Sequence, residues 1–139
     1  MKQQTILWFR VDLRLSDNPA LKKAIDLNLP VLPIFIYDEE DAHSRSLGAA
    51  SKWWLHKSLE NLSSELELVG SKLLIFRGKA EEVLQKLIHE TKSTNVLWNR
   101  RYEPWAVKRD RLIKEKLSAQ LINIMSFNGS LLYEPWEIK

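Results

Sequence analysis

The sequence predicts an α/β protein built on a doubly wound, five-stranded parallel sheet, and three observations support this prediction. Segments typical of strands and of helices alternate along the chain. The strand segments are nearly continuous apolar runs, as expected for strands that are buried on both faces of a sheet. The helix segments instead carry apolar residues at steps of three and four, the spacing of one helical face.

The first strand and the first helix have clear local signals. Residues 5–9 (TILWF) are β-branched, apolar and aromatic, which favours a buried strand. A polar loop follows. Asn18 is a favourable N-cap residue and Pro19 is a favourable first helical residue, so a short helix should begin there and continue to about residue 26.

A second buried strand is predicted at residues 31–37 (VLPIFIY). Proline donates no ladder hydrogen bond, so Pro33 indicates a bulge or an edge position. The next helix has a regular apolar stripe, made by Leu55, Leu59, Leu62, Leu66 and Val69. Gly70 stands where a left-handed residue commonly ends a helix.

The second half of the chain continues the alternation. Strands are predicted at residues 72–76, 95–98 and 121–127, and helices at 79–91 and from Pro104 onwards. The first of these helices should bury Val83, Leu84, Leu87 and Ile88. The second should place Trp105, Leu112, Ile113 and Leu117 on one side.

These elements predict a Rossmann-like sheet in the order 3-2-1-4-5, with helices on both faces and right-handed crossovers. The length suits one domain, which we place at residues 1–130. Residues 131–139 have no partner element and are expected to begin an interdomain linker.

Composition excludes several classes of function. The chain has no cysteine, which excludes disulfides and thiolate metal sites. Its three histidines lack the spacing of metal ligands, and no glycine-rich phosphate loop is present. No apolar run is long enough to span a membrane, and no signal peptide is recognisable, so we expect a cytoplasmic protein without a metal. The net charge of +3 permits contact with nucleic acid without requiring it.

A ligand site is expected where the strand order reverses, beyond the carboxyl ends of strands one and four. Arg10 and Asp12 follow the first strand, and Arg101 and Glu103 follow the fourth. The six tryptophans have two open interpretations, a well-packed core or aromatic walls for a planar ligand.

Five segments in order resemble the photolyase and cryptochrome family. They are WFRVDLRLSDNPAL (8–21), PVLPIFIYD (30–38), GAASKWWLHKSLENL (48–62), WNRRYEPWAVKRD (98–110) and FNGSLLYEPW (127–136). The resemblance covers the whole chain. It implies the amino-terminal light-harvesting domain of a deoxyribodipyrimidine photolyase, an enzyme that repairs ultraviolet-induced pyrimidine dimers in DNA. The alternative is the same domain of a cryptochrome photoreceptor.

The resemblance further implies a larger parent, in which FAD and damaged DNA bind to a helical carboxyl-terminal domain that this chain lacks. The chain alone is then expected to be inactive in repair. Its own partners would be the antenna chromophore and that FAD domain.

By position, the resemblance assigns six residues to the antenna chromophore: Arg10, Asp12, Phe35, Ile36, Lys52 and Glu103. The chromophore class stays open among deazaflavin, folate and FMN. Arg101 stands where some deazaflavin or flavin binders have an acid, and Trp105 and Ala106 replace an Asn–Glu pair used for folate. A folate stacked on tryptophan is a further alternative.

Two other functions are compatible with the residues. One is a free-standing nucleotide-binding α/β module. The other is a small nucleic-acid binder that uses the basic residues Lys108, Arg109, Arg111, Lys114 and Lys116. Asp110 and Glu115 interrupt this basic series, so we interpret it as a solvated helix face.

Overall fold

We describe the protein from a computed structural model. It describes residues 4–10, 13, 15, 18–38, 49–101 and 104–127, apart from the side chains of residues 38 and 49–52. Within these ranges strands and helices alternate: β1 (Gln4–Phe9), α1 (Pro19–Asp26), β2 (Val31–Asp38), α3 (Ala49–Leu68), β3 (Leu74–Gly78), α4 (Ala80–Thr91), β4 (Ser93–Asn99), α5 (Pro104–Ser118) and β5 (Asn123–Phe127).

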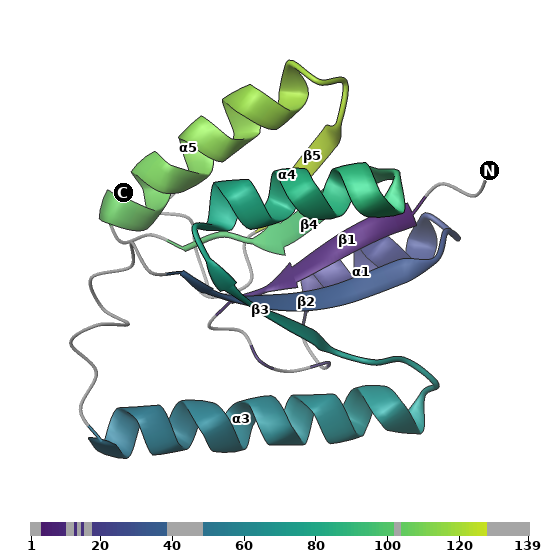
Figure 1. Ribbon diagram of the computed structural model, residues 1–139. Coiled ribbons are helices and arrows are strands. Elements are labelled where there is room, and N and C mark those ends of the chain that lie inside the picture. Colours follow the sequence, from purple (N-terminus) through teal and green to yellow (C-terminus); the bar gives the residue numbers. More distant parts are fainter. Residues whose placement is uncertain are drawn as a thin grey trace, which may run out of the picture.

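The five strands form one parallel sheet in the order β3-β2-β1-β4-β5, which confirms the predicted topology (Figure 1). The chain starts in the centre at β1 and moves outward through β2 and β3. It then crosses to the other side of β1 and continues through β4 and β5. The strand order therefore reverses between β1 and β4, at the predicted place.

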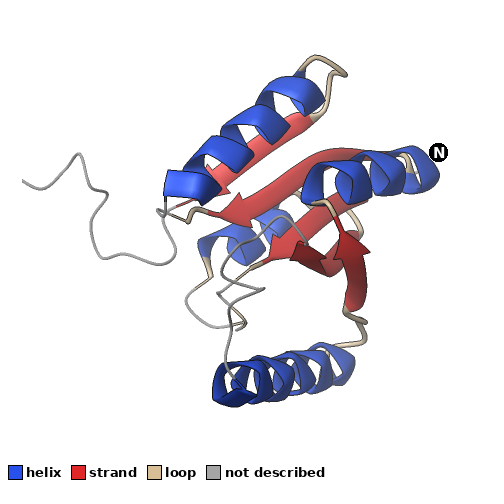
Figure 2. Ribbon diagram, turned by 60° about the vertical axis from the view of Figure 1, so that its left-hand side comes forward, coloured by secondary structure: helices blue, strands red, loops and turns tan. Residues whose placement is uncertain are grey.

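Helices cover both faces of the sheet, α4 and α5 on one face and α1 and α3 on the other (Figures 1 and 2). Successive residues of a strand point to opposite faces. Ile6 and Trp8 of β1 accordingly join the core under α4 and α5. Leu7 and Phe9 join the core under α1 and α3. Each central strand thus contributes to two separate cores, which explains its continuous apolar sequence.

Local signals set the ends of two helices on the α1/α3 face. The side chain of Asn18 accepts a hydrogen bond from the Leu21 N–H at 3.1 Å, and Pro19 is the first residue of α1. Gly70 has a φ of +80°. The Gly70 and Ser71 N–H groups donate to the carbonyls of Glu67 and Leu66 at 3.1 and 2.8 Å, which satisfies the last turn of α3. Both predicted helix signals are confirmed.

Pro33 lies within a regular strand rather than at a bulge. Its partner in β1 is Leu7, and the β1–β2 register runs on without a shift. Pairing with β3 begins one residue later, at Ile34 opposite Leu74. At Pro33 the strand therefore pairs with β1 only. The missing N–H of Pro33 then loses no hydrogen bond to β3.

Three predicted positions differ in the structure. The third strand is shifted to Leu74–Gly78 because β3 is an edge strand and accommodates the polar Arg77, which lies over the Tyr37 ring at 5.5 Å. Val69 lies beyond the end of α3 and is 71% exposed. Leu121 is 93% exposed because it makes the turn after α5 with a φ of +65°, and β5 begins at Asn123.

The buried face of α5 also differs from the prediction. Leu112 is 48% exposed, and the buried positions are Ala106, Ile113 and Leu117. Asp110 lies between these positions at helical spacing, four residues after Ala106 and three before Ile113. The apolar stripe of α5 therefore contains one carboxylate, and this residue organises the site described next.

Candidate functional site

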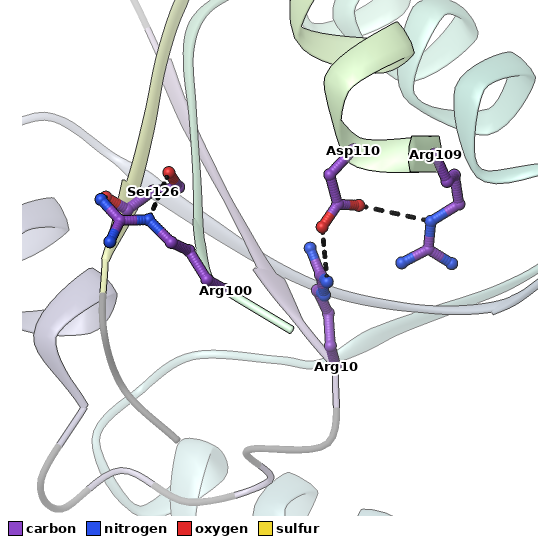
Figure 3. Close-up of polar contacts among 5 residues, drawn as sticks. All are labelled: Arg10, Arg100, Arg109, Asp110 and Ser126. Carbon is purple, nitrogen blue, oxygen red and sulfur yellow. Dashed lines mark hydrogen bonds and ion pairs between the residues drawn. The ribbon is translucent and has the colours of Figure 1, made fainter. Parts of the chain in front are cut away.

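Beyond the carboxyl ends of β1 and β4, the chain leaves the sheet at Arg10 and Arg100. These two arginines make different contacts (Figure 3). Arg100 turns toward β5, where its Nε and Nη2 donate to the hydroxyl and the carbonyl of Ser126 at 3.1 and 3.2 Å. Arg10 turns toward α5, and only 4% of it is exposed. The predicted crevice is thus bordered by two anchored cations.

Asp110 is the counterion of Arg10. Its Oδ2 lies 2.7 Å from Arg10 Nη2, and its Oδ1 lies 3.3 Å from Arg109 Nε (Figure 3). One carboxylate therefore serves two guanidinium groups beneath the first turns of α5. A buried ion pair of this kind is costly to disrupt, because removing one partner leaves the other charge without compensation in a low dielectric.

Aromatic rings surround the same cations. Trp8 and Trp98 pack edge to face, with ring centroids 5.4 Å apart. The Arg10 guanidinium lies over both rings, at 4.8 Å from the Trp8 centroid and 5.9 Å from that of Trp98. Such contacts offset part of the desolvation cost of a buried cation.

The series continues toward the start of α5. Arg109 lies 5.1 Å from the centroid of Trp8 and 4.9 Å from that of Trp105, and Arg101 lies 4.7 Å from the Trp105 centroid. We call this alternating set the arginine–tryptophan ladder; its members are Trp98, Arg10, Trp8, Arg109, Trp105 and Arg101. It joins the ends of β1 and β4 to α5 through fixed side chains.

Burial lowers the pKa of Arg10 from its ordinary value to about 10. Desolvation is the main cause, the Asp110 carboxylate opposes it, and the neighbouring cations Arg109 and Arg101 add to the lowering. The guanidinium nevertheless remains charged at neutral pH. Arg10 is thus a permanent buried cation with a fixed direction, suited to hold structure or to set a local field rather than to exchange protons.

On the α1/α3 face, a pair of neutral side chains forms hydrogen bonds at the same edge of the sheet. Asn99, the last residue of β4, donates to the Asn18 side chain at 2.7 Å and accepts from the Ala20 N–H at 3.1 Å. Asn18 also caps α1, so the two amides join the start of α1 to the end of β4. Both side chains are buried.

The six predicted site residues do not come together in the described part of the chain. Phe35 is buried on the α1/α3 face, packed edge to face on Tyr37 with centroids 5.0 Å apart. Ile36 is buried in the core on the opposite face, beneath α4. Arg10 is held on that same face by Asp110. Adjacent strand residues point to opposite faces, so the side chains of Phe35 and Ile36 lie on different faces of the sheet.

The other three predicted residues cannot be placed in this way. Asp12 and Glu103 lie outside the described residues, and Lys52 lies in α3 but its side chain is not described. Any common surface for a planar ligand at this crevice would depend on these three side chains.

The interpretation of the basic series of α5 as a solvated face is wrong at Arg109 and Asp110, whose side chains are only 14% and 13% exposed, and no partner was predicted for Asn99. A signal for Asp110 was present, because a carboxylate on the apolar stripe of α5 requires a buried partner. Asn99 offered a weaker signal, as a polar residue directly after a strand that is buried along most of its length. Among the described residues there is no cluster of His, Asp or Glu that could hold a metal ion. None of the helices in the described residues is both long enough and apolar enough to cross a membrane.

Comparisons of sequence and of structure match this chain to the same group of known proteins. The family model for DNA photolyase matches residues 5–139. A deoxyribodipyrimidine photo-lyase of Agrobacterium fabrum is 46% identical over 94% of this chain and 26% of its own length. Cryptochrome-2 of Arabidopsis thaliana is 43% identical over 99% of this chain and 22% of its own length. The chain therefore spans about a quarter of the length of these relatives.

Solved structures agree with this comparison. A class III photolyase from Agrobacterium tumefaciens superposes with a TM-score of 0.93 and 43% identity, over 100% of this chain and 28% of its own. A photolyase from Sulfolobus tokodaii, solved with two FAD molecules, has a TM-score of 0.86 and 28% identity over 99% of this chain and 32% of its own. The chain belongs to the DNA photolyase family.

Proposed function

We propose that this chain is the amino-terminal antenna domain of a DNA photolyase that repairs ultraviolet-induced pyrimidine dimers. The observation that carries the proposal is the 46% identity to the Agrobacterium photolyase over nearly the whole chain, together with the fold it shares with the class III enzyme. FAD and the damaged DNA then bind to the remaining part of the parent protein.

A bound antenna chromophore would supply absorption of near-ultraviolet or blue light and transfer of excitation to FAD in the remaining part of the parent protein. This chain contributes position and a low-dielectric surrounding rather than bond-breaking chemistry. The arginine–tryptophan ladder and the Asn18–Asn99 pair hold the carboxyl edge of the sheet rigid on its two faces. Rigid support of this kind keeps the distance and orientation between two chromophores constant.

For the chromophore itself we propose a deazaflavin, FMN or a folate. Two FAD molecules in the Sulfolobus relative support a flavin-type ligand. For a deazaflavin or flavin we keep the crevice residues Arg10, Asp12, Phe35, Ile36, Lys52 and Glu103 as the proposed contacts. Of these, Asp12 and Glu103 are the most informative to change, since Arg10, Phe35 and Ile36 are buried in the protein core.

The test is an absorption spectrum of the purified chain, before and after addition of a deazaflavin, FMN or a reduced folate. We expect one ligand to bind with a shifted band, and Asp12→Asn or Glu103→Gln to weaken that binding. Absence of binding by all three ligands would refute an antenna site within this chain.

A folate stacked on tryptophan would need an accessible ring face. Trp8 and Trp105 each have two guanidinium groups within 5.1 Å of the ring centroid, which leaves little room for a planar ligand. Trp53 and Trp54, near the start of α3, are 62% and 63% exposed. We therefore propose these two rings for that mode. Replacing either of them by leucine should abolish folate binding, whereas Trp105→Leu should not change it directly.

A cryptochrome photoreceptor is the second candidate, supported by the 43% identity to Cryptochrome-2. Repair of a dimer-containing oligonucleotide in light by the full-length parent separates the two functions, because a pure photoreceptor leaves the dimer intact. We expect repair by the parent and none by this chain alone, even with added FAD. A cytoplasmic location stays a prediction.

A further inference from the structure

A second hollow adjoins the proposed chromophore crevice, between α5 and the carboxyl ends of β4 and β5, and shares Arg100 with its border. Its volume is about 250 Å³, and its lining is Trp98, Arg100, Arg101, Val107, Asp110, Arg111, Lys114 and Ser126. Half of these residues are cations. The apolar part of the lining comes from the buried Trp98 and from Val107, which is 38% exposed.

Among the described residues that line this hollow, cations outnumber carboxylates. Four cations face a single carboxylate, Asp110, which is already engaged with Arg10 at 2.7 Å and with Arg109 at 3.3 Å. Arg111 and Lys114 are exposed and lie three residues apart on one side of α5. In the described part of the chain neither of them makes an ion pair.

Two of the cations are held in place before any ligand arrives. Arg100 is fixed by its two hydrogen bonds to Ser126 and by a backbone hydrogen bond from its N–H to the Phe127 carbonyl at 2.7 Å. Arg101 lies against the Trp105 ring, 4.7 Å from its centroid. Fixed donors lose little conformational entropy on binding, so such a site gains affinity from each contact.

We propose that this hollow binds a small anion with at least two negative charges, carried on phosphate or carboxylate groups. Guanidinium groups suit such anions because their paired N–H donors match two oxygens at once. The volume is smaller than the range of about 300–1,000 Å³ usual for whole drug-sized ligands, so it fits an anionic group rather than a complete chromophore. This proposal goes beyond the antenna function and does not depend on it.

A nucleic acid fits the same helix less well. Lys108 and Arg109 line a different hollow on the α4 side of α5, together with Trp105 and Leu112. Lys116 is paired with Glu81 at 2.7 Å. The basic residues of α5 are thus divided between two sides and do not form one continuous stripe along which a phosphate backbone would run.

The direct test is calorimetric titration of the 139-residue chain with inorganic pyrophosphate at low and at moderate salt. We expect saturable binding with one site, weakened at least about tenfold in Arg111→Gln/Lys114→Gln. The matched control is Lys22→Gln/Lys23→Gln on α1, which removes the same charge from exposed positions and should change affinity less than about twofold. Circular dichroism verifies that both variants remain folded.

Absence of pyrophosphate binding overturns the proposal. Equal losses of affinity in the two double variants also overturn it, because they would show that pyrophosphate responds to the overall charge of the chain and not to this hollow. Saturable binding of a short DNA duplex with no binding of pyrophosphate overturns it in favour of a nucleic-acid surface.

A comparison of FMN with riboflavin identifies the source of the anion. If FMN binds more tightly and Arg111→Gln/Lys114→Gln removes the difference, the anion is the tail of a larger ligand. If pyrophosphate binds while FMN and riboflavin behave alike, the anion is a separate small molecule. Failure of both flavins bears on the antenna function, whereas failure of pyrophosphate bears only on this anion site.

Discussion

The two faces of the sheet solve the same problem with different chemistry. Each must connect the end of a central strand to a helix at the carboxyl edge. The α4/α5 face does so with buried charge, through Arg10, Asp110 and the ladder rings. The α1/α3 face uses two neutral amides, Asn18 and Asn99. One edge of the sheet therefore combines a charged pair, in which loss of the carboxylate should be strongly destabilising, with a neutral pair, in which loss of one partner should cost less stability.

The largest effect is expected from Asp110→Ala. It leaves Arg10 buried without its carboxylate, which should lower the free energy of unfolding by about 3–5 kcal/mol. Arg10→Met should cost only about 1 kcal/mol, a lost cation–π contact, because Asp110 retains Arg109 at 3.3 Å. Urea denaturation of the two variants measures the difference. A larger loss for Arg10→Met would contradict the view that the uncompensated cation is the costly species.

On the neutral face, Asn99→Leu should cost about 1–3 kcal/mol, since it leaves the buried Ala20 N–H without an acceptor. Asn18→Asp is the matched control. It keeps an oxygen both for the Leu21 N–H and for the Asn99 amide, so its cost should be below about 1 kcal/mol. Thermal unfolding of the two variants measures both losses of stability. Equal losses would show that the amide pair does not act through these hydrogen bonds.

A smaller effect distinguishes the faces by pH. Burial lowers the pKa of Arg10 to about 10 in the folded protein, below its value in the unfolded chain, so above pH 10 the unfolded state binds more protons. Stability due to this group therefore rises with pH in that range. The unmutated chain should gain stability relative to Arg10→Met between pH 10 and 11. The difference between the two free energies of unfolding should be constant from pH 6 to 9. Paired denaturation curves test this, and a falling difference above pH 10 would contradict it.

The smallest effects concern the helix ends on the two faces. Gly70 after α3 and Leu121 after α5 both have positive φ, at +80° and +65°. Gly70→Ala should destabilise by about 1 kcal/mol, because the strain is conformational and a Cβ there would meet open space. Leu121→Gly should instead be neutral or stabilising by up to about 1 kcal/mol, because Leu121 is 93% exposed and glycine adopts a positive φ without strain. Melting temperatures check both signs, and a destabilised Leu121→Gly would contradict the view that backbone strain dominates at this turn.

Much of the fold could be predicted from local sequence. The apolar runs located all five strands, and the order of the elements was sufficient for the topology β3-β2-β1-β4-β5. Asn18 and Gly70 marked helix ends correctly because capping depends on a few neighbouring residues. Period-two alternation in strands also predicts that the side chains of Phe35 and Ile36 lie on opposite faces of the sheet, as the structure shows.

The position of the candidate site at the switch between β1 and β4 likewise followed from the order of elements. Its contents did not. Arg10 meets Asp110, and Asn18 meets Asn99, across long stretches of chain. Local periodicity determines which residues are buried, because it depends on backbone geometry. Only the tertiary structure decided which buried polar groups meet, because that depends on how strands and helices from distant segments are placed side by side.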